Sequence, residues 1–139
     1  SPIISEYSSV IAKVSEIRKI LKKYQINFSK KYKNCCLEGR DISTKILPKS
    51  DIKFFFKCSL EIASKRRCKE LRMKDSKIKL KDVKKALRIR NISDTTRKNS
   101  PLLKHRDSVE IDTGKLDKSA MLAKMSKYVE RVLKKKYVK

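Results

Sequence analysis

The side chains that most often do chemistry in proteins are few in this sequence, and their spacing is unfavourable. There are four cysteines, Cys35, Cys36, Cys58 and Cys68, and one histidine, His105. No Cys-x-x-Cys motif and no Cys/His pair at zinc spacing occurs, so no metal site is predicted. A cysteine–histidine nucleophile would need His105, which lies in a stretch without clear periodicity. We expect reduced thiols that pack as small apolar groups.

Phosphate-transfer and acid–base chemistry have no visible motif either. The sequence contains no glycine-rich phosphate loop. Asp82 is interpreted as the acid at the start of a helix, because no second carboxylate at a useful spacing supports acid–base catalysis. We therefore expect a protein that is not an enzyme and that uses no cofactor and no small-molecule substrate.

Positive charge is the dominant chemical feature of the chain. Lys and Arg number 39 against 15 Asp and Glu, which gives a net charge of +24. A compact protein with this charge repels itself and attracts a polyanion, and nucleic acid is the most common one. No run of 18 apolar residues is present, and the stretch SPIISEYSSV lacks the pattern of a secretory signal. Neither a membrane span nor a membrane partner is expected.

The pattern of apolar residues predicts an all-α protein. Two glycines and three prolines are too few for a turn-rich β protein. Lys77–Lys81 alternates polar and apolar residues, which predicts a very short strand or an extended loop. Apolar residues at i, i+3, i+4 and i+7 predict four helices, over residues 8–25, 51–74, 82–90 and 116–137.

Three regions are expected along the chain. Residues 1–90 form a helical domain with an extended first connection, in which a loop covers about 38–50. Residues 91–115 are rich in Ser, Thr, Asn and Asp and form a linker or irregular extension. Residues 116–139 form an amphipathic C-terminal helix with Asp117 at its start and lysines at its end.

The order of a short helix, a long helix, a brief loop and a short helix resembles the histone fold. The terminal helix LDKSAMLAKMSKYVERVLKKKYVK is similar to the extra C-terminal helix of one core-histone type. The sequence departs from core histones at Asp75, where they carry an arginine, and in its longer first connection, so the resemblance is to a divergent viral or parasite histone. The best-matching stretch is residues 50–90, within which three short motifs carry the likeness: Lys77-Ile78-Lys79, Asp82-Val83 and Ala86-Leu87-Arg88.

The resemblance implies a DNA-packaging function. A histone-fold chain cannot bury its central helix alone, so it implies an obligate heterodimer with a second histone-fold chain, within a larger histone assembly or nucleosome-like particle. Duplex DNA would be held through its phosphates, without base reading. By position, the implied DNA contacts are Arg18, Lys22, Lys23, Lys45, Lys49, Lys77, Lys79 and Lys81. The implied dimer interface is Ile52, Phe55, Phe56, Leu60, Ile62, Ala63, Val83 and Leu87.

Two other functions fit the same composition. A ribosomal or other rRNA-binding structural protein would have the same lysine-rich helices. A histone-fold subunit of a transcription or kinetochore complex would share the fold, although such subunits rarely need a charge of +24. The expected location is the nucleus and its chromatin, or the virion or viral factory for a viral protein.

Overall fold

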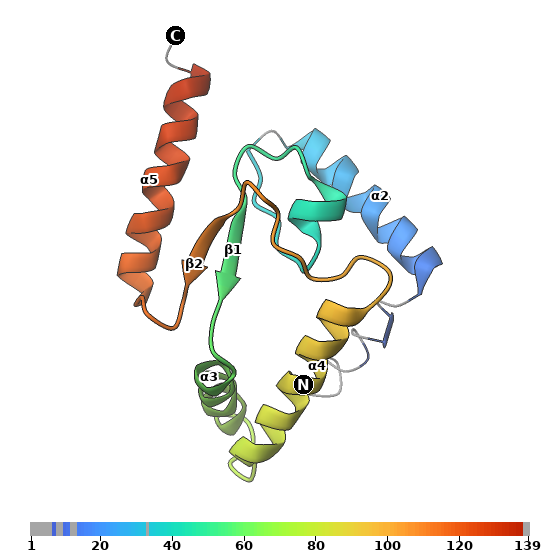
Figure 1. The fold of residues 1–139 in the computed structure, drawn as a ribbon, viewed down its shortest axis with the longest axis vertical. Helices are drawn as coiled ribbons and strands as arrows, with labels where there is room; N and C mark the ends of the chain where they lie inside the picture. Colours follow the sequence, from blue (N-terminus) through green and yellow to red (C-terminus); the bar gives the residue numbers. More distant parts are fainter. Residues whose placement is uncertain (1–6, 8–9, 12–13, 33, 138–139) are drawn as a thin grey trace. The chain divides into compact units, whose positions relative to one another are not determined.

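The structure, a computed structural model, forms two compact units (Figure 1). Unit 1 contains residues 1–49 and 90–104, and unit 2 contains residues 50–89 and 105–139. The structure describes residues 7, 10–11, 14–32 and 34–137. None of the helices in these ranges is both long enough and apolar enough to cross a membrane.

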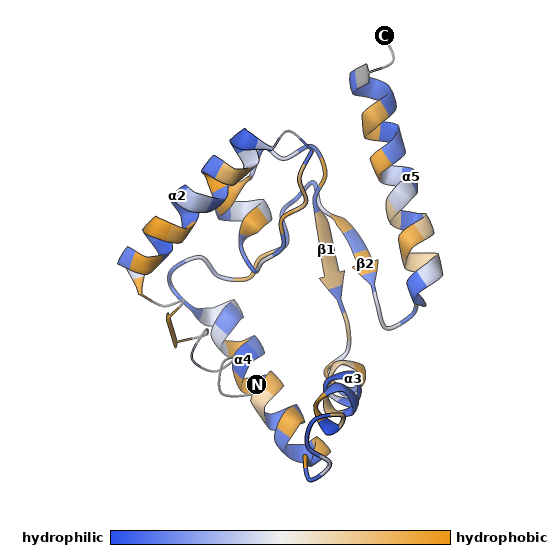
Figure 2. Ribbon diagram, turned by 180° about the vertical axis from the view of Figure 1, so that it is seen from behind, coloured by the Kyte–Doolittle hydropathy of each residue, from blue (hydrophilic) through white to orange (hydrophobic). Residues whose placement is uncertain are grey.

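Helix α2 (Ser15–Lys31) is the main helix of unit 1. Glu16 lies in its first turn and Lys30 and Lys31 in its last, which places each charge where the helix dipole favours it. None of its residues is buried, and Figure 2 shows apolar and polar bands alternating along it. The helix begins later and ends later than the predicted 8–25, of which residues 8–9 and 12–13 lie outside the described residues.

A short π-helical turn, η1 (Ile42–Ile46), follows in unit 1 and contacts α2. The carbonyl oxygen of Asp41 accepts hydrogen bonds from the amides of Lys45 at 2.8 Å and Ile46 at 3.3 Å. Ile46 is buried, so its side chain packs η1 into unit 1. Single π turns are uncommon and often occur at functional sites, because they redirect side chains. Here the turn holds the backbone of Asp41 in place.

Unit 2 contains a two-stranded parallel sheet, formed by β1 (Phe54–Lys57) and β2 (Val109–Asp112). Phe54 lies opposite Val109, and the register continues to Lys57 opposite Asp112. Ile111 is fully buried and forms the centre of the small apolar core. The connection between the two strands contains both α3 and α4, as parallel pairing requires a long crossover.

Helix α3 (Leu60–Arg72) begins at Ser59, whose hydroxyl oxygen accepts a hydrogen bond from the amide of Ile62 at 3.2 Å. Helix α4 (Leu80–Thr96) starts within unit 2, and its residues from Arg90 onward belong to unit 1. Cys68 of α3 and Val83 of α4 are both buried in unit 2.

Helix α5 (Lys118–Tyr137) occupies nearly the range predicted for the terminal helix. The carboxylate of Asp117 accepts a hydrogen bond from the amide of Ala120 at 2.7 Å and so caps its start. The ring of Tyr128 meets the edge of Phe54, with the centroids 6.4 Å apart, which attaches α5 to the sheet.

The all-α prediction and the histone order of helices are wrong. Phe54–Lys57 is a strand, so the predicted helix over 51–74 is split into β1 and α3, because three consecutive aromatic residues favour extended backbone and Ser59 starts a new helix. Lys77–Lys81 is not a strand but a turn that runs into α4. The predicted linker over 91–115 contains the end of α4 and all of β2.

Candidate functional site

Asp94 is the centre of a cluster of three arginines in unit 1. Its side chain is 5% exposed. The distances from its carboxylate oxygens are 3.2 Å to Nε of Arg40, 3.8 Å to Nε of Arg90 and 3.5 Å to Nη1 of Arg97. Arg90 and Asp94 lie near the end of α4 and Arg97 directly follows it, with its amide bonded to the carbonyl oxygen of Ser93. The spacings of four and three residues put the three side chains on one face. Arg40 comes from the segment before η1.

The Asp94 cluster, as we name these four residues, carries an excess of positive charge. Three guanidinium groups surround one carboxylate, so two positive charges are left uncompensated within it. Burial lowers the pKa of the Arg40 guanidinium, Asp94 opposes this shift, and Arg90 and Arg97 lower it further. An arginine stays charged at neutral pH even so. The cluster is therefore built to attract an anion.

Two buried polar atoms in the cluster have no hydrogen-bond partner in the protein. They are Nε of Arg90, a donor, and Oδ2 of Asp94, an acceptor. Oδ2 lies 3.2 Å from Arg40, but the ion pair is not aligned as a hydrogen bond. A donor and an acceptor 3.8 Å apart suit a hydroxyl group that accepts from one and donates to the other.

The chain after α4 folds back and fixes the cluster. Nε of Arg97 donates to the carbonyl oxygen of Ser100 at 2.7 Å, and the amide of Leu102 donates to the carbonyl oxygen of Asp94 at 2.6 Å. Ser100 has φ of 52°, in the left-handed region that non-glycine residues seldom adopt. Its carbonyl oxygen holds Arg97, so the strained backbone supports the cluster.

A second ion pair lies next to the cluster in sequence and in space. Asp41 follows Arg40 directly, and its carboxylate accepts a short hydrogen bond from Nη2 of Arg18 in α2. Both side chains are largely buried, at 17% and 11% exposed for Arg18 and Asp41. The side chain of Arg40 thus pairs with a residue of α4, and the side chain of Asp41 pairs with a residue of α2.

Gly39 precedes these two residues at a point where a side chain does not fit. A Cβ atom there would lie 2.8 Å from Cγ1 of Ile42. We expect Gly39→Ala to lower the free energy of unfolding by about 1–3 kcal/mol, because the Ile42 side chain must shift inside the turn. Urea denaturation of the two proteins measures this difference. Gly114→Ala, where the closest contact is 3.1 Å, should cost less, and an equal cost would contradict the explanation.

The cations predicted to contact DNA are spread over both units. Lys22 and Lys23 are exposed on α2, Lys45 lies in η1, and Lys49 is exposed just after it. Of the eight, Arg18 alone takes part in the ion pairs described above. The remaining three are exposed around the turn before α4 and at its start: Lys77, Lys79 and Lys81.

The residues predicted to form a dimer interface belong to unit 2. Val83 is buried within the unit itself, and Phe56 is 50% exposed on β1. The other six are half-buried in β1, α3, α4 and the segment before β1: Ile52, Phe55, Leu60, Ile62, Ala63 and Leu87.

The prediction that the cysteines pack as apolar groups is wrong for two of the four. Cys35 and Cys36 are exposed, Cys58 is half-buried and Cys68 is buried; all four are free thiols. Cys58 also lies between β1 and α3 rather than on one helix with Cys68. Among the described residues, no group of three or more His, Cys, Asp or Glu could hold a metal ion.

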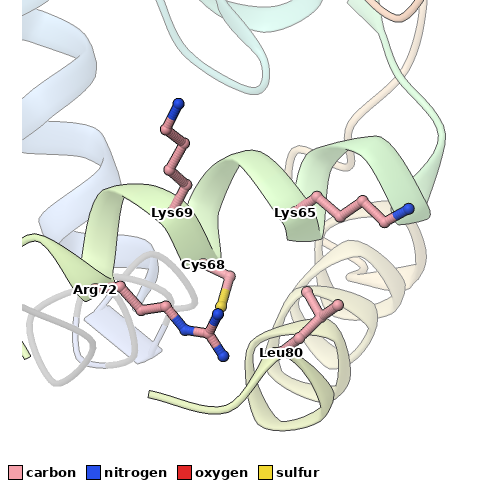
Figure 3. A pocket seen from close by; sticks show the side chains of 5 residues that line it. All are labelled: Lys65, Cys68, Lys69, Arg72 and Leu80. Atoms are coloured by element: carbon pink, nitrogen blue, oxygen red, sulfur yellow. The ribbon is translucent and has the colours of Figure 1, made fainter. Parts of the chain in front are cut away.

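A hollow of about 230 Å³ in unit 2 is lined mainly by basic side chains of α3. Figure 3 shows that Lys65 and Lys69 point away from it in different directions, while the guanidinium of Arg72 lies beside Cys68 and Leu80. Nε of Arg72 also donates to the carbonyl oxygen of Ile78 at 2.9 Å. The cations do not converge on one point, so the Asp94 cluster is the better candidate site.

Sequence reasoning missed every residue of the Asp94 cluster. The spacing of Arg90, Asp94 and Arg97 is a helical signal, but the Asn, Ser and Thr residues among them indicated a linker. Arg40 is 54 residues from Asp94, and no local pattern connects two residues so far apart.

Comparison with known proteins matches one family over nearly the whole chain. The sequence model of the cytidylate kinase family matches residues 1–131. A cytidylate kinase of Clostridium botulinum strain Langeland is 38% identical over 130 residues, which cover 94% of this chain and 59% of that protein. One from strain Hall is 43% identical over 112 residues, covering 81% and 51%. One from Rickettsia akari is 35% identical over 127 residues, covering 91% and 58%.

These matches correct the histone hypothesis and what it implied. The relatives are bacterial kinases, not histones, so packaging of duplex DNA, a histone-fold partner and a nuclear or viral location are wrong, as are the rRNA-binding and kinetochore alternatives. The relatives are named as kinases, which are enzymes that act on small molecules. This contradicts the expectation of a protein that is not an enzyme and the expectation of no small-molecule substrate. The chain spans about three-fifths of the length of the relatives it matches. It belongs to the cytidylate kinase family.

Proposed function

We propose that unit 1 binds cytidylate as the phosphoryl acceptor of a kinase reaction. The observation that carries this proposal is the Asp94 cluster, in which three arginines share one buried carboxylate. Cytidylate offers three groups for recognition: a phosphate, sugar hydroxyls and a pyrimidine ring. Unit 1 has a set of side chains suited to each of them.

The phosphate suits the excess positive charge of the cluster. Guanidinium groups bind phosphate oxygens through two parallel hydrogen bonds, and such charged bonds are stronger than neutral ones. The side chains of Arg40 and Arg90 are 38% and 37% exposed, so they are accessible to a ligand, while Arg97 is only 8% exposed. Asp94 keeps the three cations together when no ligand is bound.

A sugar hydroxyl suits the two unpaired atoms. It would accept a hydrogen bond from Nε of Arg90 and donate one to Oδ2 of Asp94, which satisfies both buried groups. Leaving such groups unsatisfied costs about 1–3 kcal/mol each, so filling the gap favours binding.

The ring of cytosine suits the pair of Arg18 and Asp41. Cytosine has an exocyclic amino group that donates and ring positions that accept, and a carboxylate paired with a guanidinium offers the matching acceptor and donor. The peptide link between Arg40 and Asp41 brings this pair close to the phosphate-binding arginines.

The reaction is the transfer of the terminal phosphoryl group of a nucleoside triphosphate. An oxygen of the cytidylate phosphate attacks that group, the bond to the leaving diphosphate breaks, and the products are two nucleoside diphosphates. Gly39 and Gly114 are too far apart to form a glycine-rich loop for the triphosphate. The proposal for this chain therefore concerns the acceptor nucleotide.

Calorimetric titration of the 139-residue chain with CMP tests the proposal. We expect CMP to bind, and Arg40→Gln to weaken binding about ten- to hundredfold, because a charge-assisted hydrogen bond contributes about 1.5–3 kcal/mol. Cytidine, which lacks the phosphate, should bind weakly to both proteins. The titrations should be run at about 150 mM salt to screen general attraction to a chain of +24.

Arg106→Gln is the matched control. It removes the same charge from a side chain that is 91% exposed and lies in unit 2. We expect it to leave the affinity for CMP unchanged. If it weakened binding as much as Arg40→Gln, the attraction would be a general effect of charge. If CMP and cytidine bound equally, the phosphate would not be recognised, and either result would contradict the proposal.

A further inference from the structure

The turn after α4 contacts Asp94 at two points. Nη1 of Arg97 pairs with Oδ1 of Asp94 at 3.5 Å, and the amide of Leu102 donates to the carbonyl oxygen of Asp94 at 2.6 Å. Between these two residues, the carbonyl oxygen of Ser100 accepts a hydrogen bond from Nε of Arg97 at 2.7 Å. The turn therefore fixes both the backbone and the carboxylate of Asp94.

The two oxygens of the Asp94 carboxylate have different surroundings. Oδ1 is held by Arg97, whose side chain is only 8% exposed. Oδ2 lies near Nε of Arg40 and Nε of Arg90, two more exposed side chains, and it has no hydrogen-bond partner among the described residues. Because a carboxylate is planar, holding Oδ1 also sets the direction of Oδ2. The oxygen left for a ligand is thus the one beside the accessible arginines.

Ser100 adopts a backbone conformation that its residue type does not favour. Its φ of 52° lies in the left-handed region, and Pro101 follows directly, although a residue before proline normally has extended backbone with negative φ. Such strain persists only where surrounding contacts hold it, and it is concentrated at ligand sites. The carbonyl oxygen of this strained residue is the one that Arg97 contacts, which links the strain to the orientation of Arg97.

We infer that Ser100 is a positioning residue that determines how strongly the site recognises the sugar hydroxyls of its nucleotide. The left-handed turn holds Arg97, Arg97 holds Oδ1 of Asp94, and Oδ2 is thereby directed at the hydroxyl that also accepts from Nε of Arg90. The inference rests on the proposed binding of cytidylate. A nucleotide without sugar hydroxyls leaves Oδ2 of Asp94 and Nε of Arg90 unsatisfied, so it should bind less well.

Titration with two nucleotides tests the inference. CMP carries both sugar hydroxyls and its 2′,3′-dideoxy analogue carries neither, while the phosphate and the ring are the same. We expect the wild-type chain to prefer CMP by at least about tenfold, because hydrogen bonds to charged groups are lost with the hydroxyls. Calorimetry at about 150 mM salt measures both affinities.

Ser100→Val should reduce this preference to less than about threefold. A β-branched residue is a genuine outlier at positive φ, so the turn relaxes, Arg97 loses its acceptor and Oδ2 of Asp94 is no longer directed. Ser100→Gly keeps the carbonyl oxygen and adopts the same φ without strain, so it should retain the wild-type preference. A general loss of stability would weaken the binding of both nucleotides equally and leave their ratio unchanged.

Ser119→Val is the matched control, because it makes the same exchange at an exposed position of α5 in unit 2. It should leave both affinities unchanged. Protection of the amide of Leu47, which donates to the carbonyl oxygen of Ile42 at 2.7 Å, shows whether unit 1 is folded in each variant.

Arg97→Lys supplies a second measurement, which decides the matter if Ser100→Val does not fold. Lysine keeps the positive charge but lacks the rigid fork that donates to Ser100 from Nε and to Asp94 from Nη1. The preference for CMP over the dideoxy analogue should therefore fall as in Ser100→Val.

The outcomes separate the inference from the proposed function. If the wild-type chain binds no CMP, the proposed function is wrong and the inference falls with it. If it binds CMP and the dideoxy analogue equally, or if the folded Ser100→Val and Arg97→Lys variants keep the wild-type preference, the inference alone is wrong. A preference in Ser100→Gly as low as in Ser100→Val would also overturn it, because the left-handed turn would then not be what positions Arg97.

Discussion

Asp94→Ala is expected to lower the free energy of unfolding of unit 1 by about 3–5 kcal/mol, because it leaves buried guanidinium groups without their carboxylate. Most of this cost should come from Arg97, whose side chain is 8% exposed. Arg40 and Arg90 are more than one-third exposed and can turn toward water, so they contribute less. Urea denaturation, together with hydrogen exchange at the amide of Leu102, measures the loss.

Two further variants separate the loss of pairing from the loss of a side chain. Asp107→Ala removes a carboxylate that is 61% exposed and should change stability by less than about 0.5 kcal/mol. Combining Asp94→Ala with Arg97→Met removes the buried charge as well, so the double variant should be more stable than Asp94→Ala alone. If the single variant cost less than about 1 kcal/mol, Asp94 would not organise the arginines.

The helices were predicted best where one apolar face and clear end signals coincide. Asp117 lies at the start of α5 and Lys134, Lys135 and Lys136 lie in its last turn, as the sequence indicates. The prediction for residues 51–74 failed because Phe55, Phe56, Leu60 and Ile62 fit a helical wheel even though they lie on two elements. Periodicity cannot separate a short strand followed by a helix from one long helix. The cap at Ser59 and the run of three phenylalanines were the available signals.

Net charge is a poor guide to the function of this chain. A charge of +24 restricts partners but does not define a fold or a site, and most of the cations lie on exposed surfaces. The informative cations are the few that are buried around carboxylates, namely Arg97 with Asp94 and Arg18 with Asp41. Arg97 and Asp94 are three residues apart, a spacing that a helix brings together. Arg18 and Asp41 are brought together only by the tertiary fold, so no spacing rule could have identified that pair.

Ile111→Ala is expected to lower the free energy of unfolding of unit 2 by about 2–5 kcal/mol. Ile111 is 0% exposed, lies opposite Phe56 in the register and is the largest fully buried side chain among the described residues. The cost combines the lost burial of its methyl groups with the cavity that they leave, in a core too small to close around it. Ile111→Val, which removes one methylene, should cost about 0.5–1.5 kcal/mol.

Ile92→Ala is the matched control for the same change of side chain, because Ile92 is 52% exposed on α4. It should cost much less than Ile111→Ala in urea denaturation. Hydrogen exchange at Val109 and Thr113 should quicken in Ile111→Ala alone, since these amides lie on either side of Ile111 and bond to the carbonyl oxygens of Lys53 and Lys57. Equal costs at the two positions would mean that the sheet does not provide the core of unit 2.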